Sequence, residues 1–145
     1  MTDLTINIVT NHGDVAPTYA HPGDAGADLR ADHHGVIPAG GRRLIRTGLQ
    51  IAIPDGYAGF VHPRSGLAWE HGVTVLNAPG TLDSGFRGDV LVNLINHGEE
   101  PFHIKPGDRI AQLVIQPVVR ANFVTVTTLD ATERGDNGHG STGVN

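Results

Sequence analysis

Glycine and proline interrupt the apolar runs of this chain at short and regular intervals. Its 145 residues include 20 glycines and 9 prolines, and most apolar runs between them are only three to eleven residues long. These runs are rich in Val, Ile and Thr, which favour strands, and a Gly or Pro at each break favours a turn. The pattern predicts an all-β fold, and the length suits one hydrophobic core.

Periodicity places the expected strands. Alternate apolar residues from Ile45 to Ile53 share one face, and the run 89–96 is apolar enough for a buried central strand. Only one short helix is expected, at 65–71, and Gly66 weakens it. The predicted strands are 4–9, 45–53, 57–62, 73–76, 89–96, 102–104, 109–119 and 122–129.

Charge and composition exclude several function classes. With no Cys, the chain has no disulfide, no thiol nucleophile and no Cys-based metal site. No apolar run reaches the roughly 18 residues of a membrane helix, so we expect a cytoplasmic protein with no membrane partner. A net charge of −5 argues against a nucleic-acid partner, yet nine Arg beside the single Lys105 suit a small anion.

Two segments combine glycine with charged side chains. In 24–29, two carboxylates four residues apart, Asp24 and Asp28, suit a hydrated cation or a polar turn. In 63–68, Arg64, the Ser65 hydroxyl and backbone N–H groups near Gly66 suit a phosphate, or an ordinary loop capped by arginine. The adjacent His33 and His34 have no third ligand nearby, and we interpret them as part of a surface loop.

The segment 77–88 predicts a tight hairpin with chemistry of its own. Gly80 and Gly85 would let a flat ligand approach backbone groups, which can pair with the edge of a base. Asp83 is a candidate general base and Phe86 could pack on a ring, although a plain hairpin with a surface carboxylate also fits. The Gly-rich segment 134–145 has no periodicity and predicts a mobile arm.

A small all-β chain must also protect its sheet edges, and oligomerisation is a common solution. The run 89–96 is then either an interface strand or ordinary core. Composition does not distinguish the two.

Taken together and in order, five segments resemble the motifs of the trimeric dUTPase family. They are DAGADL (24–29), PRSGLA (63–68), NAPGTLDSGFRGDV (77–90), GDRIAQLVIQP (107–117) and RGDNGHGSTG (134–143). The resemblance implies a jelly-roll-like (β-clip) subunit over residues 1–133, a flexible arm over 134–145, and a homotrimer whose active sites are shared between chains.

The same resemblance implies hydrolysis of dUTP to dUMP and pyrophosphate. Asp83 would activate the attacking water, and Asp28 would contact a substrate-chelated Mg²⁺ through water. The implied substrate-binding residues are Arg64, Ser65, Gly66 and Gln112 for phosphate, Asn77, Gly80, Thr81 and Leu82 for uracil, Asp83 and Phe86 for the sugar, and Arg134, His139, Ser141 and Thr142 in the arm.

Three positions depart from the family pattern. Phe86 stands where Tyr is usual, and His139 stands where Phe is frequent. Leu91 stands where some members have Lys, so we expect no ligand contact from it. Two other functions remain open at this point. One is a deoxycytidine triphosphate deaminase, which shares the fold, and the other is a non-catalytic oligomeric β-sandwich that binds a small anion.

Overall fold

The computed structural model describes residues 3–11 and 15–144, and within them the chain is almost entirely β. The all-β prediction is confirmed. The elements are β1 (Asn7–Thr10), β2 (Gly26–Arg30), β3 (Gly35–Ile37), β4 (Arg42–Ala52), β5 (Tyr57–His62), α1 (Ser65–His71), β6 (Val73–Val75), β7 (Gly80–Leu82), β8 (Asp89–Asn96), β9 (Phe102–Ile104) and β10 (Arg109–Pro117).

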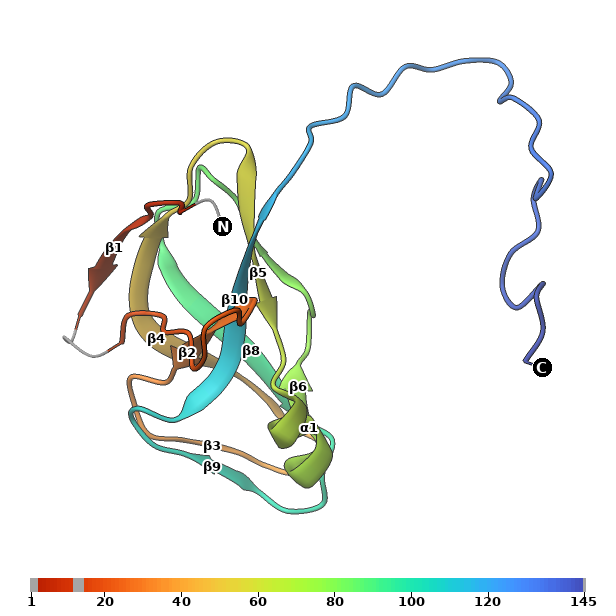
Figure 1. The fold of residues 1–145 in the computed structure, drawn as a ribbon. Helices are drawn as coiled ribbons and strands as arrows, with labels where there is room; N and C mark the ends of the chain where they lie inside the picture. Colours follow the sequence, from red (N-terminus) through yellow and green to blue (C-terminus); the bar gives the residue numbers. More distant parts are fainter. Residues whose placement is uncertain (1–2, 12–14, 145) are drawn as a thin grey trace.

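The strands form two antiparallel four-stranded sheets and a two-stranded ribbon (Figure 1). One sheet has the order β1-β4-β8-β6 and the other the order β2-β10-β5-β7, while β3 pairs with β9. Strands that are adjacent in a sheet are often far apart in the sequence, as β4 and β8 are. Most of the fold therefore depends on contacts between distant residues. These crossovers bring motifs that are far apart in sequence onto adjacent strands.

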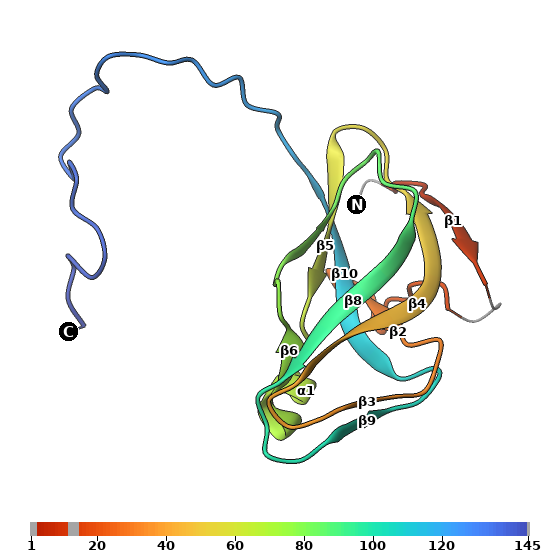
Figure 2. The same ribbon diagram turned by 180° about the vertical axis from the view of Figure 1, so that it is seen from behind.

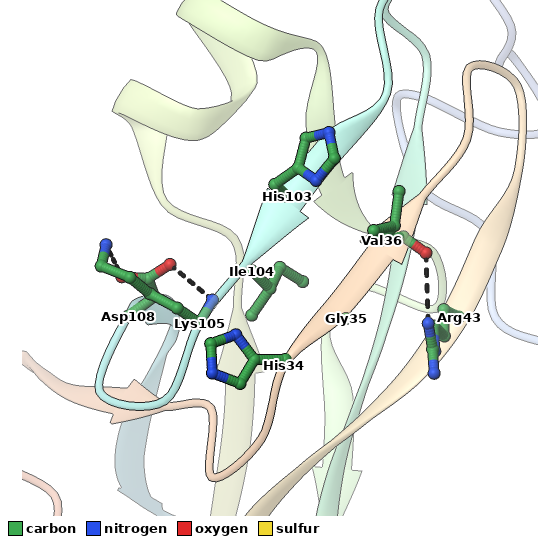
Figure 3. Close-up of a pocket in the computed structure, with 8 residues that line it drawn as sticks. All are labelled: His34, Gly35, Val36, Arg43, His103, Ile104, Lys105 and Asp108. Atoms are coloured by element: carbon green, nitrogen blue, oxygen red, sulfur yellow. Dashed lines mark hydrogen bonds and ion pairs between the residues drawn. The ribbon is translucent and has the colours of Figure 1, made fainter.

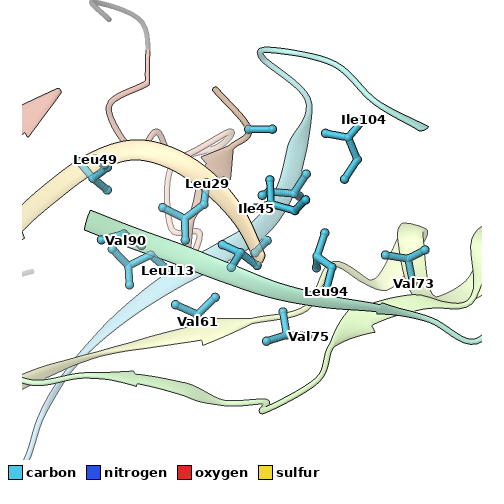
Figure 4. Packing of buried hydrophobic residues seen from close by; sticks show 14 of the residues in the cluster. Leu29, Ile45, Leu49, Val61, Val73, Val75, Val90, Leu94, Ile104 and Leu113 are labelled. Atoms are coloured by element: carbon cyan, nitrogen blue, oxygen red, sulfur yellow. The ribbon is translucent and has the colours of Figure 1, made fainter. Parts of the chain in front are cut away.

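A single apolar cluster lies between the sheets (Figure 4). β4 alternates as predicted, because Ile45, Leu49 and Ile51 point inward while Arg46 lies exposed. Both sheets contribute to the cluster, and so does the ribbon through Ile37 and Ile104 (3% exposed or less). Burial of these aliphatic side chains holds the two sheets face to face.

β8 lies between β4 and β6 as a central strand, but only one of its faces is buried in this chain. Val90, Val92 and Leu94 are buried, whereas Leu91 on the opposite face is 42% exposed. The inner face of the run 89–96 is therefore core. The outer face presents an apolar side chain to solvent in the single chain.

The helix α1 begins at Ser65 and ends at His71, as predicted. Gly72 adopts the left-handed conformation at φ 67° and its N–H donates to Ala68 O, which closes the helix. A glycine is favoured there because other residues meet a Cβ clash at positive φ. Among the described residues, no helix is long and apolar enough to cross a membrane.

The predicted strand 122–129 is wrong. The chain leaves the sheets after Pro117, and residues 118–144 run away from them, as both views show (Figures 1 and 2). Phe123 and Leu129 are 92% and 86% exposed. A strand needs a hydrogen-bonding neighbour, and none lies beside this segment within the described part of the chain. Likewise the first strand begins at Asn7, three residues later than predicted.

Candidate active site

The first, second and fourth motifs meet in one cavity of about 360 Å³. Asp28 comes from β2, Gln112 from β10, and Arg64 follows the end of β5. β10 pairs with both β2 and β5, and Gln112 stands opposite Asp28 on one side and His62 on the other. The cavity is lined by Ala20, Asp24, Ala25, Gly26, Asp28, Arg64, Ser65, Gly66, Arg109 and Gln112.

Two guanidinium groups flank Asp28 in this cavity. Arg64 Nε lies 3.5 Å from Asp28 Oδ1, and Arg109 Nη1 lies 3.4 Å from Oδ2. Arg64 also donates to the Arg109 carbonyl at 3.3 Å, which ties the two arginines together. Asp28 is only 9% exposed, so its carboxylate holds both cations against the cavity wall. Paired guanidinium groups of this kind suit the oxygens of a phosphate chain.

Arg109 was not among the predicted site residues. Arg109 lies inside the fourth motif, in the sequence GDRIAQ, so its motif position marked it as a candidate. The local sequence does not show where its side chain points. The pairing of β10 with β2 brings it to Asp28, 81 residues away in the sequence. Strand pairing at this range cannot be read from local pattern.

Gln112 is oriented by its neighbours. Its Nε2 donates to the Pro63 carbonyl at 3.0 Å, which fixes the amide beside Arg64. A Cβ on Gly26 would collide with Gln112 Oε1, so only glycine at position 26 leaves the amide in place. The Gln112 side chain is thus fixed in the cavity wall next to the guanidinium groups of Arg64 and Arg109.

The third motif forms a second, smaller cavity of about 80 Å³. Gly80 is buried and stands opposite Val61 in the β5–β7 pairing, while Asn77 is exposed at the entry to the hairpin. The cavity brings together the four residues predicted to contact uracil. It is lined by Val61, Val75, Asn77, Gly80, Thr81, Leu82, Leu91, Val92 and Asn93.

Asp83 and Phe86 lie in a tight turn beyond this cavity. Phe86 N donates to the Asp83 carbonyl at 3.1 Å, and Arg87 Nη1 donates to the carbonyls of Ser84 (2.6 Å) and Phe86 (2.8 Å). Ser84 Oγ donates to Asp55 Oδ1 at 3.0 Å, which anchors the turn to the β4–β5 connection. Asp83 is exposed, so a water molecule can reach its carboxylate.

The turn and the larger cavity lie at opposite ends of β5. Leu82 pairs with Gly59, while Arg64 follows the other end of the strand. The five residue steps from Gly59 to Arg64 span roughly 17 Å of extended chain. Figures 1 and 2 show the same separation, with α1 at one end of the sheets and the turn after β7 at the other. Within one chain, Asp83 and Arg64 are too far apart to act on one phosphorus atom.

The predicted arm residues lie apart from both cavities. Arg134, His139, Ser141 and Thr142 are exposed on the extended C-terminal segment and line neither cavity. His139 adopts φ 47°, and Arg134 Nε donates to the Asn137 carbonyl at 3.0 Å. The hydrogen bonds of the described arm residues 134–144 are all local, either within the arm or from Gly135 N to Thr132.

A third hollow of about 620 Å³ lies over the β3–β9 ribbon, and Asp108 of the fourth motif is among its lining residues (Figure 3). His34 is exposed at its edge, whereas His33 Nδ1 lies 2.7 Å from Asp32 Oδ1. Asp108 accepts hydrogen bonds from Lys105 Nζ at 2.7 Å and Lys105 N at 3.0 Å. Within residues 3–11 and 15–144, no three His, Asp or Glu side chains cluster as a metal site would require.

The fold and the cavities define a class: a small antiparallel β protein whose polar cavity, flanked by two guanidinium groups, suits phosphate oxygens. Among known proteins, the dUTPase family model matches residues 14–143. The chain is 57% identical to the deoxyuridine 5'-triphosphate nucleotidohydrolase of Cutibacterium acnes over 88% of this chain and 85% of that protein. It is 52% identical to the enzyme of the same name from Tropheryma whipplei (strain Twist), over 97% and 96%.

Solved structures agree with these relatives. The dUTPase of Staphylococcus bacteriophage 80alpha (G164S mutant), solved with dUpNHpp, superposes with a TM-score of 0.89 at 25% identity, covering 97% of this chain and 99% of the other. The chain belongs to the dUTPase family of hydrolases.

Proposed function

We propose that this chain hydrolyses dUTP to dUMP and pyrophosphate in the cytoplasm, keeping uracil out of DNA and supplying dUMP for thymidylate synthesis. The observation that carries the proposal is the division of the site into two cavities of different character. One is polar and flanked by the Arg64 and Arg109 guanidinium groups, as a triphosphate needs. The other is narrow and walled by hairpin backbone, as a flat base needs.

The same geometry supports a homotrimer of jelly-roll-like subunits with shared sites. Asp83 and Arg64 lie at opposite ends of β5, so a single substrate can reach both only if they come from different chains. The arm, which carries Arg134, His139, Ser141 and Thr142, would reach a site formed by two other chains. Its glycines lose entropy on ordering, so closure requires contacts with bound ligand.

Asp83 is the proposed general base. Its carboxylate accepts a proton from a water molecule as that water attacks the α-phosphorus, and the bond from this phosphorus to the bridging oxygen breaks. The pyrophosphate leaves with the electron pair. Arg64, Ser65, Gly66 and Gln112 hold phosphate oxygens, so positioning and charge stabilisation supply most of the rate.

The residues of the larger cavity suit a hydrated Mg²⁺ carried by the substrate. Asp24 and Asp28 are hard oxygen donors beside the phosphate-binding side chains, and Mg²⁺ typically binds one or two carboxylates together with substrate phosphates and waters. Asp28 would contact the ion through a water. When bound, the ion would screen the charge of the triphosphate and shape it for attack.

Base and sugar selectivity would come from the hairpin. Asn77 and the backbone of Gly80, Thr81 and Leu82 would pair with the uracil edge, while cytosine would leave a donor facing a donor. Each mismatched buried group costs about 1–3 kcal/mol. Phe86 would lie under the deoxyribose, where its ring leaves no room for a 2′-hydroxyl. His139 would stack on the uracil when the arm closes.

The test is pyrophosphate release from dUTP, dTTP, dCTP and UTP side by side, with Mg²⁺. We expect turnover of dUTP and little of the other three. Asp83→Asn should retain dUTP binding while kcat falls by about 10²–10⁴-fold, the range for a lost general base. Asp136→Asn in the arm, which removes an exposed carboxylate of no assigned role, is the matched control.

Each alternative function has a distinct outcome in this assay. Ammonia release from dCTP would indicate the deaminase. Binding of dUTP without pyrophosphate release by the unmodified protein would indicate a non-catalytic anion-binding sandwich. Comparable turnover of UTP and dUTP would remove the proposed role of Phe86.

A further inference from the structure

We propose that Gly88 determines the sugar selectivity of the site, because its missing side chain sets the position of the Phe86 ring. This rests on the proposed function, in which that ring lies against C2′ of the deoxyribose. Gly88 carries no functional group and touches no ligand in the proposal. Its effect is exerted through Phe86, so it is a specificity-determining residue that acts by positioning.

The Phe86 ring occupies the space that a side chain at position 88 would need. A Cβ built on Gly88 would lie 2.8 Å from Phe86 Cζ and 3.0 Å from Cε2. Carbon atoms attract one another best at about 3.5–4.0 Å, so both separations are strongly repulsive. The ring therefore rests directly on the glycine backbone, and alanine at this position would displace it.

The ring, and not the backbone, is the part that can move. Three hydrogen bonds fix the turn: Phe86 N to Asp83 O, and Arg87 Nη1 to the carbonyls of Ser84 and Phe86. Ser84 Oγ anchors the same turn to Asp55. Phe86 itself is 40% exposed, so its ring can turn about χ1 to another staggered rotamer at small cost.

A ring turned away from Gly88 no longer blocks the 2′ position. The space beneath the sugar then admits a hydroxyl group, and the favourable contact with deoxyribose is lost. We expect Gly88→Ala to weaken binding of the deoxy ligand and to strengthen binding of the ribo ligand. The turn itself, together with Asp83, stays in place.

Gly85 provides a matched control in the same turn. A Cβ on Gly85 would meet no atom within 4 Å, whereas a Cβ on Gly88 would be crowded by Phe86. The φ angle of Gly85 lies outside the positive range, so alanine is tolerated there. Gly85→Ala therefore makes the same chemical change three residues away without touching the ring. Both variants should unfold at nearly the wild-type temperature.

The experiment measures binding of the non-hydrolysable analogue dUpNHpp and its ribo counterpart by calorimetry, to the full-length wild type, Gly88→Ala and Gly85→Ala. The expected result is a deoxy-over-ribo affinity ratio that falls by about tenfold or more in Gly88→Ala and stays at the wild-type value in Gly85→Ala. In a Phe86→Ala background, Gly88→Ala should have no further effect on the ratio, because the ring on which it acts is gone.

An unchanged ratio in Gly88→Ala would overturn the inference, and so would an equal fall in Gly85→Ala or a wild type that does not distinguish the two sugars. These readings need no turnover. Failure of the wild type to release pyrophosphate from dUTP would instead reject the proposed function, so the two failures are distinguishable.

Discussion

Arg109 joins the two halves of the larger cavity. Its guanidinium contacts Asp28 on β2, and its carbonyl accepts a hydrogen bond from Arg64 at the end of β5. Asp28 thus faces a guanidinium group on each side, and each group has further N–H donors for the oxygens of a ligand. We infer that Arg109 binds phosphate oxygens alongside Arg64.

Arg109→Ala should therefore raise the KM for dUTP by about tenfold or more, since a charge-assisted hydrogen bond contributes about 1.5–3 kcal/mol. Steady-state kinetics checks this result. Arg30→Ala is the control, because Arg30 stands opposite Arg109 on β2 but donates to the Gly107 carbonyl outside the cavity. Equal changes in the two variants would contradict the assignment.

Asp108 provides a pH-dependent contribution to stability. Burial alone would raise its pKa, but the hydrogen bonds from Lys105 and the nearby charges of Lys105 and His34 outweigh burial and hold the pKa below the ordinary value for Asp. The folded state therefore binds this proton less readily than the unfolded state. The resulting stability is present above the unfolded pKa of about 3.9 and is lost as pH falls through the folded value.

Asp108→Asn should lower the free energy of unfolding by up to about 1 kcal/mol at pH 7. The difference in unfolding free energy between the variant and the wild type should shrink once the pH falls below the pKa of Asp108 in the folded protein. Urea denaturation at a series of pH values measures this effect. A difference that is independent of pH would show that the carboxylate charge is not involved.

Sequence motifs predicted about half of the residues that line the two cavities, but not how they are distributed. Asp28, Arg64 and Gln112 line one cavity together. The motif order along the chain contains no sign that Asp83 lies at the far end of β5 from Arg64. Nor does it show that Asp28 is flanked by two guanidinium groups, because both facts depend on strand pairing between distant residues.

Some strand boundaries followed local pattern, whereas β1 and β4, whose partner strands also lie in this chain, begin three residues away from their predicted starts. The predicted limits of β5, α1, β8 and β9 match those of the structure, because alternation and turn residues are local signals. The segment 122–129 has the same apolar alternation but no partner strand beside it in the described chain. Pattern alone indicates the capacity to form a strand, while hydrogen bonding to a neighbour decides whether one forms.

β4 contains an irregularity that sequence alternation did not reveal. Its pairing with β8 shifts register between Arg46 and Gln50, and Gly48 within this bulge adopts φ 68°. Thr47 Oγ1 donates to the Val90 carbonyl at 2.7 Å inside the shift. A Cβ on Gly48 would also lie 3.2 Å from Asp32 Oδ2. The bulge therefore requires glycine for its backbone conformation and for the space that Asp32 occupies.

Gly48→Ala should lower the free energy of unfolding by about 2–3 kcal/mol, combining the cost of positive φ with crowding against Asp32. Gly40→Ala isolates the first cost, because Gly40 has φ 72° but nothing within 4 Å of its Cβ. We expect a loss of about 1–2 kcal/mol there. Chemical denaturation compares the two, and equal losses would show that Asp32 yields without cost.

At the scale of the whole molecule, the single chain leaves apolar surface uncovered. Phe123, Val124, Val126 and Leu129 are 58–92% exposed on a segment that leaves the sheets, and Leu91 faces outward from β8. Exposed apolar side chains concentrated in one segment, as in 123–129, are typical of an interaction surface. Together with the divided active site, they favour an assembly in which 118–133 packs on a neighbouring chain and 134–145 reaches the ligand.

Two truncations separate these roles. Ending the chain at Glu133 should leave a particle of three truncated chains in solution, because the described residues that are deleted, 134–144, make only local hydrogen bonds. Turnover of dUTP should fall by about a hundredfold or more as the closing contacts are lost.

Ending the chain at Pro117 removes the four apolar side chains as well and should give monomers. Sedimentation equilibrium measures both masses, and a trimer that survives the longer deletion would place its main interface elsewhere, on the outer face of β8.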